Sequence, residues 1–181
     1  MDRGPTTAEL PHGVRVEALS PHPDERGWLC ELYRESDCAG PVPVQWNVIH
    51  SGAGVLRGVR VHVRNADSVV LVSGRAYVGM QDLRPGSPTD GSAVLLPLSV
   101  ECPTRVTIPA GIAHGFYFPE PAILLVGLTH AWDPGDEYGC SWADPDLRIP
   151  WPVSAPVLSD KDGQRHSLAE LRALLESWKT S

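Results

Sequence analysis

Residues 55–64 bring together the side chains of this chain that are best able to do chemistry. Valine occupies positions 55, 59, 61 and 63, and Arg60, His62 and Arg64 alternate with the last three of these valines. Alternation with a period of two predicts a strand with one apolar and one polar face. A polar face is stable in water and costly to bury without partners. We therefore expect this strand either to expose its polar face or to line a pocket for a charged ligand.

A second polar group follows a turn further along the chain. Residues 109–114 have the order P-x-G-x-x-H, which resembles a signature of the cupin jelly-roll superfamily and ends at His114. In many cupins the partner motif is H-x-H followed by a carboxylate, and here the corresponding residues are Arg60, His62 and Asp67. Two imidazoles and one carboxylate suit Fe²⁺ or another divalent metal. His62, Asp67 and His114 are thus a candidate metal-ligand set.

The elements that must position these residues are mostly short strands. The 17 glycines and 18 prolines favour many strands with tight turns over long helices. Their spacing predicts an all-β sandwich, barrel or jelly roll. We expect a turn over 21–27 and an irregular stretch over 131–162. Strands are expected over 14–19, 28–33, 42–51, 55–64, 69–72, 76–83, 93–98, 105–108, 114–118 and 122–129, the last of them buried on both faces.

Only the C-terminal tail has a helical pattern. Ser167 and Glu170 have the spacing of a capping box, with Ser167 as N-cap. Apolar residues then follow at helical spacing, which predicts an amphipathic helix packed on the core. The expected organisation is a flexible lead-in over 1–12, a β domain over 13–165 and a helix over 166–181. The apolar residues of the helix are Leu168, Leu171, Leu174, Leu175 and Trp178.

Length and charge exclude several classes of protein. A chain of 181 residues is most simply one domain. A net charge of -7 argues against nucleic-acid binding. No signal-like or membrane-spanning apolar run is present.

The four cysteines give no sign of a structural site. The spacing of Cys30, Cys38, Cys102 and Cys140 suggests neither a zinc site nor a disulfide framework. Reduced, buried thiols and a cytoplasmic location are expected.

A closer resemblance extends over most of the chain. In order and over about 140 residues, seven short pieces resemble the dTDP-4-dehydrorhamnose 3,5-epimerase family. The resemblance implies a cupin-type double-stranded β-helix, no cofactor and a sugar-nucleotide substrate. The pieces are Glu25-Arg26-Gly27 with Glu31, Gln45-Trp46-Asn47 with Ser51, Gly54-Val55-Leu56-Arg57-Gly58, Ser87-Pro88-Thr89-Asp90-Gly91, Ile108-Pro109 through His114-Gly115-Phe116, Trp142-Ala143-Asp144-Pro145 with Ile149-Pro150-Trp151-Pro152, and Ser159-Asp160-Lys161-Asp162.

The family's chemistry can be carried over residue by residue. Its members remove a proton next to a 4-keto group and return it on the other face of the sugar. A histidine is the base and an aspartate orients it, a lysine helps to hold the enolate oxygen, and a tyrosine is the acid. The aspartate corresponds to Asp162. Residues that hold the nucleotide and sugar correspond to Arg26, Glu31, Gln45, Asn47, Arg57 and His114.

Three catalytic positions differ from the family. Arg60 occupies the base position, and arginine stays protonated near neutral pH. The lysine position falls near Asp67 or Ser68, where an acid would repel an enolate. Trp132 occupies the acid position, and its indole has only an N–H donor. The family's own proton transfer is therefore not expected, and Asp162 is expected to pair with Arg60.

The sequence supports three hypotheses about function. The candidate catalytic residues are Arg60, His62, His114, Trp132 and Asp162. The first is a diverged epimerase or isomerase of a dTDP-4-keto-6-deoxysugar, used in deoxysugar or secondary-metabolite biosynthesis, with His62 or His114 as base. The second is a metal-dependent cupin. The third is a cupin that has become a binding scaffold or cyclase, whose Arg60 and Arg64 bind an acidic small molecule. The resemblance also implies a homodimer in which the Arg26 segment completes the neighbouring site.

Overall fold

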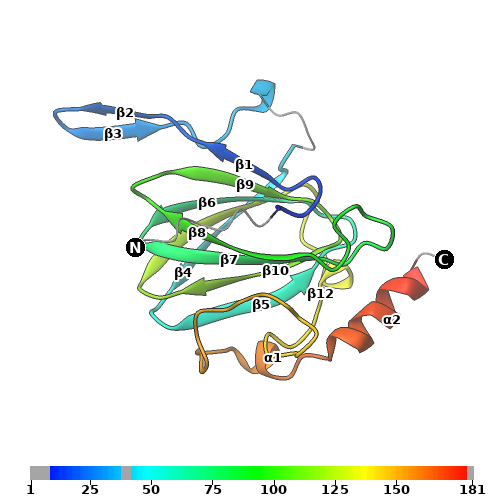
Figure 1. The fold of residues 1–181 in the computed structure, drawn as a ribbon. Coiled ribbons are helices and arrows are strands. Elements are labelled where there is room, and N and C mark those ends of the chain that lie inside the picture. Colours follow the sequence, from blue (N-terminus) through cyan, green and yellow to red (C-terminus); the bar gives the residue numbers. More distant parts are fainter. Residues whose placement is uncertain (1–8, 38–41, 179–181) are drawn as a thin grey trace.

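Two five-stranded antiparallel sheets face each other and form a jelly roll (Figure 1). The computed structural model describes residues 9–37 and 42–178, so most of the expected lead-in, together with Cys38, lies outside the described residues. The expected all-β, cupin-type fold is confirmed. The first sheet contains, in order, β1 (Arg15–Ala18), β9 (Thr104–Ile108), β6 (Asp67–Ser73), β11 (Ala122–Leu128) and β4 (Gln45–Ser51). The second contains β12 (Tyr138–Gly139), β5 (Val55–Val61), β10 (Ile112–Phe118), β7 (Arg75–Asp82) and β8 (Ala93–Ser99).

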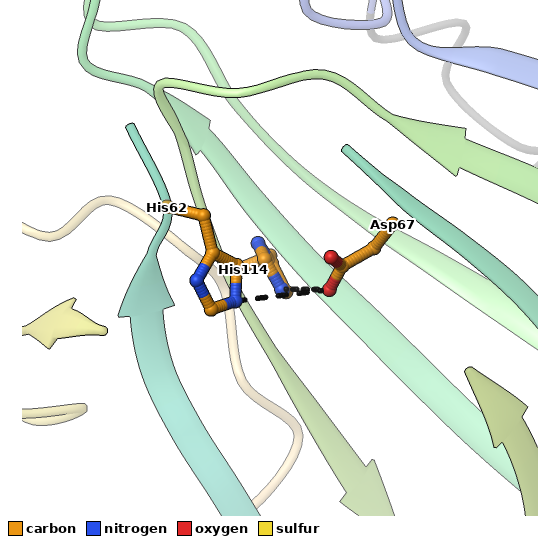
Figure 2. Close-up of side chains that lie close together, drawn as sticks. All are labelled: His62, Asp67 and His114. Carbon is orange, nitrogen blue, oxygen red and sulfur yellow. Dashed lines mark hydrogen bonds and ion pairs between the residues drawn. The ribbon is translucent and has the colours of Figure 1, made fainter. Parts of the chain in front are cut away.

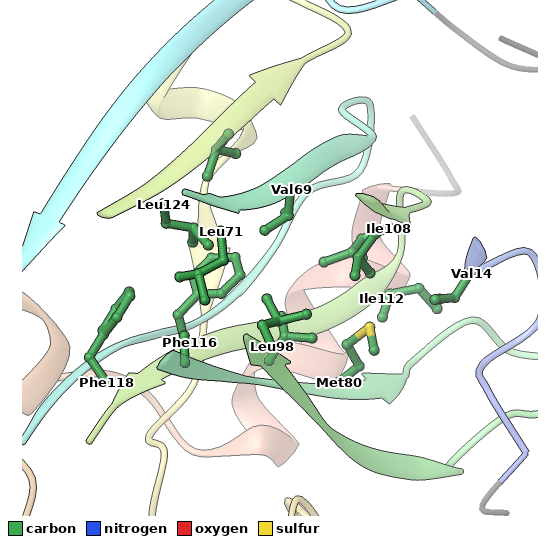
Figure 3. Packing of buried hydrophobic residues seen from close by; sticks show 14 of the residues in the cluster. Val14, Val69, Leu71, Met80, Leu98, Ile108, Ile112, Phe116, Phe118 and Leu124 are labelled. Carbon is green, nitrogen blue, oxygen red and sulfur yellow. The ribbon is translucent and has the colours of Figure 1, made fainter. Parts of the chain in front are cut away.

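The main hydrophobic core fills the space between the two sheets. Val69 and Leu71 from β6 meet Met80 from β7 and Phe116 and Phe118 from β10 (Figure 3). All five side chains are buried. Burying a side chain of this size contributes about 1.5–3 kcal/mol, so this core holds both walls of the jelly roll in place.

A second core covers the outer face of the second sheet. Val59 and Val61 of β5 are fully buried there against Leu147 and against Leu171 of the C-terminal helix α2 (Leu168–Trp178). Because neighbouring side chains of a strand point to opposite faces, Arg60 between the two valines points toward the first sheet. The alternation in the sequence is thereby confirmed for this part of β5.

The expected capping box begins α2. The Ser167 hydroxyl accepts a hydrogen bond from the backbone N–H of Glu170 at 3.2 Å, and the Glu170 carboxylate accepts one from the Ser167 N–H at 2.8 Å. The tail is not the only helix, however. A short helix α1 (Asp160–Gly163) begins at the N-cap Ser159, and 3₁₀ turns occur at η1 (Glu35–Asp37) and η2 (Pro134–Asp136).

Two predictions about strands are wrong, one for residues 21–27 and one for the end of the strand expected over 55–64. The turn expected over 21–27 is a hairpin of β2 (Pro21–Asp24) and β3 (Gly27–Cys30) that projects from the jelly roll (Figure 1). Proline is tolerated there because β2 pairs on one side only. Strand β5 ends at Val61 instead of continuing to residue 64, because the Asp136 carboxylate takes the N–H groups of Val63 and Arg64.

Three further expectations need correction. The strand expected over 69–72 begins earlier, at Asp67, which is buried at the start of β6. Strand β11 is not buried on both faces, since Ile123 and Leu125 alternate with the core residues Leu124 and Val126 and remain partly exposed. The three described cysteines are free, but only Cys140 is buried, whereas Cys30 is partly exposed and Cys102 is exposed.

Candidate active site

A cavity of about 270 Å³ opens between the two sheets, where β5 and β10 face β4, β6 and β11. Aliphatic and aromatic side chains form part of its wall, and ionisable side chains form most of the rest. Four of the five candidate catalytic residues line it, and the fifth, Asp162, lies behind Arg60. The lining residues are Asn47, Ile49, Arg57, Arg60, His62, Asp67, His114, Phe116, Val126, Leu128, Trp132 and Glu137.

A bulge in β5 directs two arginines into this cavity. His114 pairs with Arg60 and Gly115 pairs with Gly58, so Val59 is passed over in the ladder with β10. A bulge of this kind changes which face the following residues occupy. Arg57 and Arg60, three positions apart, therefore both reach the cavity, whereas a regular strand would place them on opposite faces.

Arg57 is a cation without a carboxylate partner among the described residues. Its Nε donates to the Ser51 hydroxyl at 2.8 Å, and its terminal nitrogen donates to the His50 carbonyl at 3.3 Å. Both partners are neutral oxygens, so they orient the guanidinium without cancelling its charge. This arrangement suits an anionic ligand such as a phosphate.

Arg60, by contrast, is held by two buried carboxylates. Its Nε lies 3.5 Å from Glu137 Oε1, and a terminal nitrogen lies 3.7 Å from Asp162 Oδ1. The expected pairing of Asp162 with Arg60 is thus confirmed. Burial raises the pKa of the Glu137 carboxyl, but Lys161, the Trp132 N–H and Arg60 together lower that pKa to about 2. Glu137 is consequently a carboxylate at neutral pH.

His62 presents one ring nitrogen to the cavity. Its Nδ1 lies 3.0 Å from the carbonyl oxygen of Asp136, so this nitrogen carries the proton and donates it. The Nε2 lone pair is then directed toward the cavity, 3.9 Å from Asp67 Oδ2. The buried Asp136 also fixes the loop after β5, since its carboxylate accepts from three consecutive backbone N–H groups, those of residues 63, 64 and 65.

Both ring nitrogens of His114 are already engaged. Nδ1 lies 3.0 Å from the Ile112 carbonyl oxygen, and Nε2 lies 3.1 Å from Asp67 Oδ2. Burial lowers the pKa of His114, but the Asp67 carboxylate and the Ile112 carbonyl outweigh it and raise the pKa overall. His114 therefore has no free lone pair in this arrangement, and the geometry favours His62 over His114 as a proton acceptor.

Trp132 lines the cavity and is itself about half exposed. Its indole N–H donates to Glu137 Oε2 at 3.0 Å, and its backbone N–H donates to Gln45 Oε1 at 2.8 Å. The Gln45 amide in turn donates to Asn47 Oδ1 at 3.0 Å. Gln45 thereby orients Asn47 and the Trp132 backbone without itself lining the cavity.

The other candidate residues lie outside the cavity of their own chain. Arg26 is at the tip of the β2–β3 hairpin and pairs with Asp24, while Glu31 pairs with Arg34. Arg64 is also outside, because it pairs with Asp133.

Two residues of the site, Asp136 and Glu137, were not predicted from the sequence. They lie in the stretch expected to be irregular. Their signal was limited to three acidic residues around the Pro-Gly turn at 134–135.

Comparison with known proteins places the chain in a family. The family model for dTDP-4-dehydrorhamnose 3,5-epimerase matches residues 9–170. The chain belongs to this family. It is 40% identical over 156 residues to the dTDP-4-dehydrorhamnose 3,5-epimerase of Pseudomonas aeruginosa, which covers 81% of this chain and 86% of the relative. The family membership predicted from the seven sequence pieces is confirmed.

Solved structures of the epimerase family agree. A double mutant of ChmJ, a 3'-monoepimerase from Streptomyces bikiniensis in complex with dTDP, superposes with a TM-score of 0.85 at 28% identity, covering 97% of this chain and 94% of that one. The epimerase RmlC from Legionella pneumophila, in complex with dTDP-4-keto-L-rhamnose, gives a TM-score of 0.82 at 31% identity, covering 90% and 91%. No described helix of this family member is long and apolar enough to cross a membrane.

Proposed function

We propose that this chain is an isomerase that epimerises a dTDP-4-keto-6-deoxyhexose with a rearranged proton-transfer set. One observation carries the proposal. In a member of an epimerase family, the carbonyl of Asp136 fixes the ring of His62 so that its Nε2 lone pair faces the cavity. This lone pair takes the proton next to the ketone, two residues beyond the position of the family histidine.

The enolate that results needs a positive charge, and Arg60 supplies it. The guanidinium lines the cavity, and its buried Nε has no hydrogen-bond partner in the described chain. The Glu137 and Asp162 carboxylates hold the group at distances longer than hydrogen bonds, so its N–H groups remain able to donate to an oxyanion. Arg60, the cation, thus occupies the position of the family's base, and His62, the proposed base, lies two residues further along the chain.

The proton that returns on the other face comes from water, and the hydroxide left behind takes the proton that His62 removed, so that water and the neutral imidazole are restored. Trp132 stands at the acid position, but an indole N–H does not transfer its proton, and this N–H is bound to Glu137. Glu137 itself is ionised at neutral pH because of its lowered pKa.

The cytoplasmic location of the protein and its use in secondary metabolism stay predictions.

The direct test is solvent exchange. We expect the protein to incorporate deuterium at C3, at C5 or at both when dTDP-4-keto-6-deoxyglucose is incubated with it in D₂O. Mass spectrometry of the sugar nucleotide measures the gain, with a known 3,5-epimerase as positive control and buffer alone as blank. No incorporation beyond the blank, under conditions where the control enzyme works, would reject the function.

Arg57 should dominate the binding of the diphosphate. Replacing Arg57→Ala removes a charged donor whose own partners are neutral oxygens, and hydrogen bonds to charged groups are worth about 1.5–3 kcal/mol. We expect the Kd for dTDP, measured by isothermal titration, to rise about 10- to 100-fold. Arg75→Ala is the matched control, because Arg75 pairs with Glu120 outside the cavity. Equal affinities of the two variants would contradict the assignment.

A homodimer is the second part of the proposal. The outer side of β4 exposes the large apolar side chains of Trp46 and Val48, and β3 exposes Trp28 and Leu29. Apolar surface of this extent is typical of protein interfaces. A second copy that covers it would also explain the projecting hairpin, whose tip carries Arg26, as a segment that completes the site of the neighbour.

Sedimentation tests the dimer. We expect a mass of two chains for the unmodified protein and of one chain for the double variant Leu29→Glu and Val48→Glu, because burying two carboxylates in an apolar interface is costly. Leu174→Glu, on an exposed position of α2, is the control and should stay dimeric. A monomeric unmodified protein at micromolar concentration would contradict this part of the proposal.

A further inference from the structure

Three side chains that line the cavity converge on one point (Figure 2). His62, Asp67 and His114 each direct one ligand atom inward, and these atoms lie within 4.8 Å of one another. We propose that His62 Nε2, His114 Nε2 and the Asp67 carboxylate form a binding site for a divalent transition metal, and that the bound metal inhibits the epimerase.

Each histidine is oriented as a metal ligand requires. The Nδ1 of His62 is bound by the carbonyl of Asp136 and the Nδ1 of His114 by the carbonyl of Ile112, both at 3.0 Å. Metal-ligating histidines typically donate their second nitrogen to a carbonyl or carboxylate, which fixes the tautomer and the ring. Two backbone carbonyls thus direct both Nε2 atoms to the same side.

Asp67 offers an oxygen that nothing else uses. Its Oδ2 is shared by the two histidines, at 3.1 Å from His114 Nε2 and 3.9 Å from His62 Nε2. Its Oδ1 is buried and has no hydrogen-bond partner in the described chain. A buried carboxylate oxygen without a partner is unusual. A metal ion would satisfy it and would replace the proton between His114 and Asp67.

The distances allow the ion. Metal–ligand bonds of about 2.0–2.2 Å place neighbouring ligand atoms roughly 3.0–3.5 Å apart. The 3.9 Å separation of His62 from Asp67, and the separations of at most 4.8 Å among all three ligand atoms, reach this range when the imidazole of His62 rotates. Arg57 and Arg60 also line the cavity, and Arg60 shares the Glu137 and Asp162 carboxylates with Lys161 and Arg165. The negative charge that a bound ion needs therefore comes from its own ligand, the Asp67 carboxylate.

The donor set selects the kind of metal. Two imidazoles and one carboxylate suit Fe²⁺, Co²⁺, Ni²⁺ or Zn²⁺, whereas Mg²⁺ and Ca²⁺ prefer oxygen ligands. Such an ion would take up the His62 lone pair that accepts the substrate proton. Metal binding does not depend on the proposed function; the inhibition rests on it.

Binding is tested on the full chain after treatment with EDTA and removal of the chelator. We expect isothermal titration with Ni²⁺ and with Zn²⁺ to give one equivalent per chain. His62→Asn and Asp67→Asn should each weaken binding at least tenfold, and His130→Asn, which removes an exposed imidazole outside the cavity, should not. Circular dichroism checks that each variant folds, and His62→Asn carries the test if Asp67→Asn does not.

The outcomes separate the two claims. Less than a tenth of an equivalent of metal, or binding that His62→Asn leaves unchanged, would overturn the metal site whether or not the protein is an epimerase. If metal binds at the site, deuterium incorporation should fall at least tenfold at one equivalent and return with EDTA. Incorporation that persists with the site filled would overturn the inhibition and, with it, the role of His62 as base.

Discussion

Replacing His62→Asn should reduce deuterium incorporation into a dTDP-4-keto-6-deoxyhexose by about 10²- to 10⁴-fold, the usual contribution of a general base. Asparagine keeps a donor for the Asp136 carbonyl, which lies 3.0 Å from His62 Nδ1. It has no basic lone pair to place where Nε2 lies. The substitution therefore removes proton transfer while it changes the shape of the cavity little.

Two controls make this result specific. The Kd for dTDP should stay within about threefold of the unmodified protein, because the diphosphate is assigned to Arg57, and a charged hydrogen bond there carries the energy. His130→Asn should exchange at the unmodified rate, since His130 is exposed and does not line the cavity. All reactions contain EDTA, so that no bound metal competes. If His62→Asn keeps more than a tenth of the rate, another group takes the proton.

The sequence predicted the walls of the site better than its chemistry. Alternation in β5 correctly placed Val59 and Val61 on one side and Arg60 on the other. The order of short motifs correctly indicated the family and the fold. Both signals are local, because side-chain direction in a strand and turn chemistry depend on neighbouring residues.

The features of the site that could not be predicted depend on contacts between residues far apart in the sequence. Asp136 binds the loop after β5 from more than 70 positions away, which ends the strand and fixes the tautomer of His62. Glu137 reaches Arg60 from the same stretch. The bulge that brings Arg57 beside Arg60 arises in the pairing of β5 with β10. No pattern within a single strand encodes such pairings, so residue types alone left His62 and His114 equivalent as bases.

Asp82 is a buried carboxylate outside the cavity whose replacement should be costly. It ends β7, is fully buried and accepts hydrogen bonds from Arg84, Ser87 and Thr89 at 2.6–3.0 Å. Breaking a buried pair of this kind costs about 3–5 kcal/mol. Asp82→Asn should lower Tm by about 10 °C for a domain of this size. Asp90→Asn, on an exposed position of the same loop, should change Tm by about 1 °C, in line with surface substitutions.

The pH dependence distinguishes loss of the charge from loss of packing. Burial alone would raise the pKa of Asp82, but the hydrogen bonds from Arg84, Ser87 and Thr89 lower it well below its ordinary value of 3.8. A carboxyl whose pKa is lowered by folding stabilises the protein fully above that ordinary value and loses this contribution as the pH falls below it. Urea unfolding should show a full difference between Asp82→Asn and the unmodified protein at pH 7 and a smaller one near pH 2.5. A difference that stays constant with pH would mean that the asparagine disturbs packing instead of removing a charge that holds the loop.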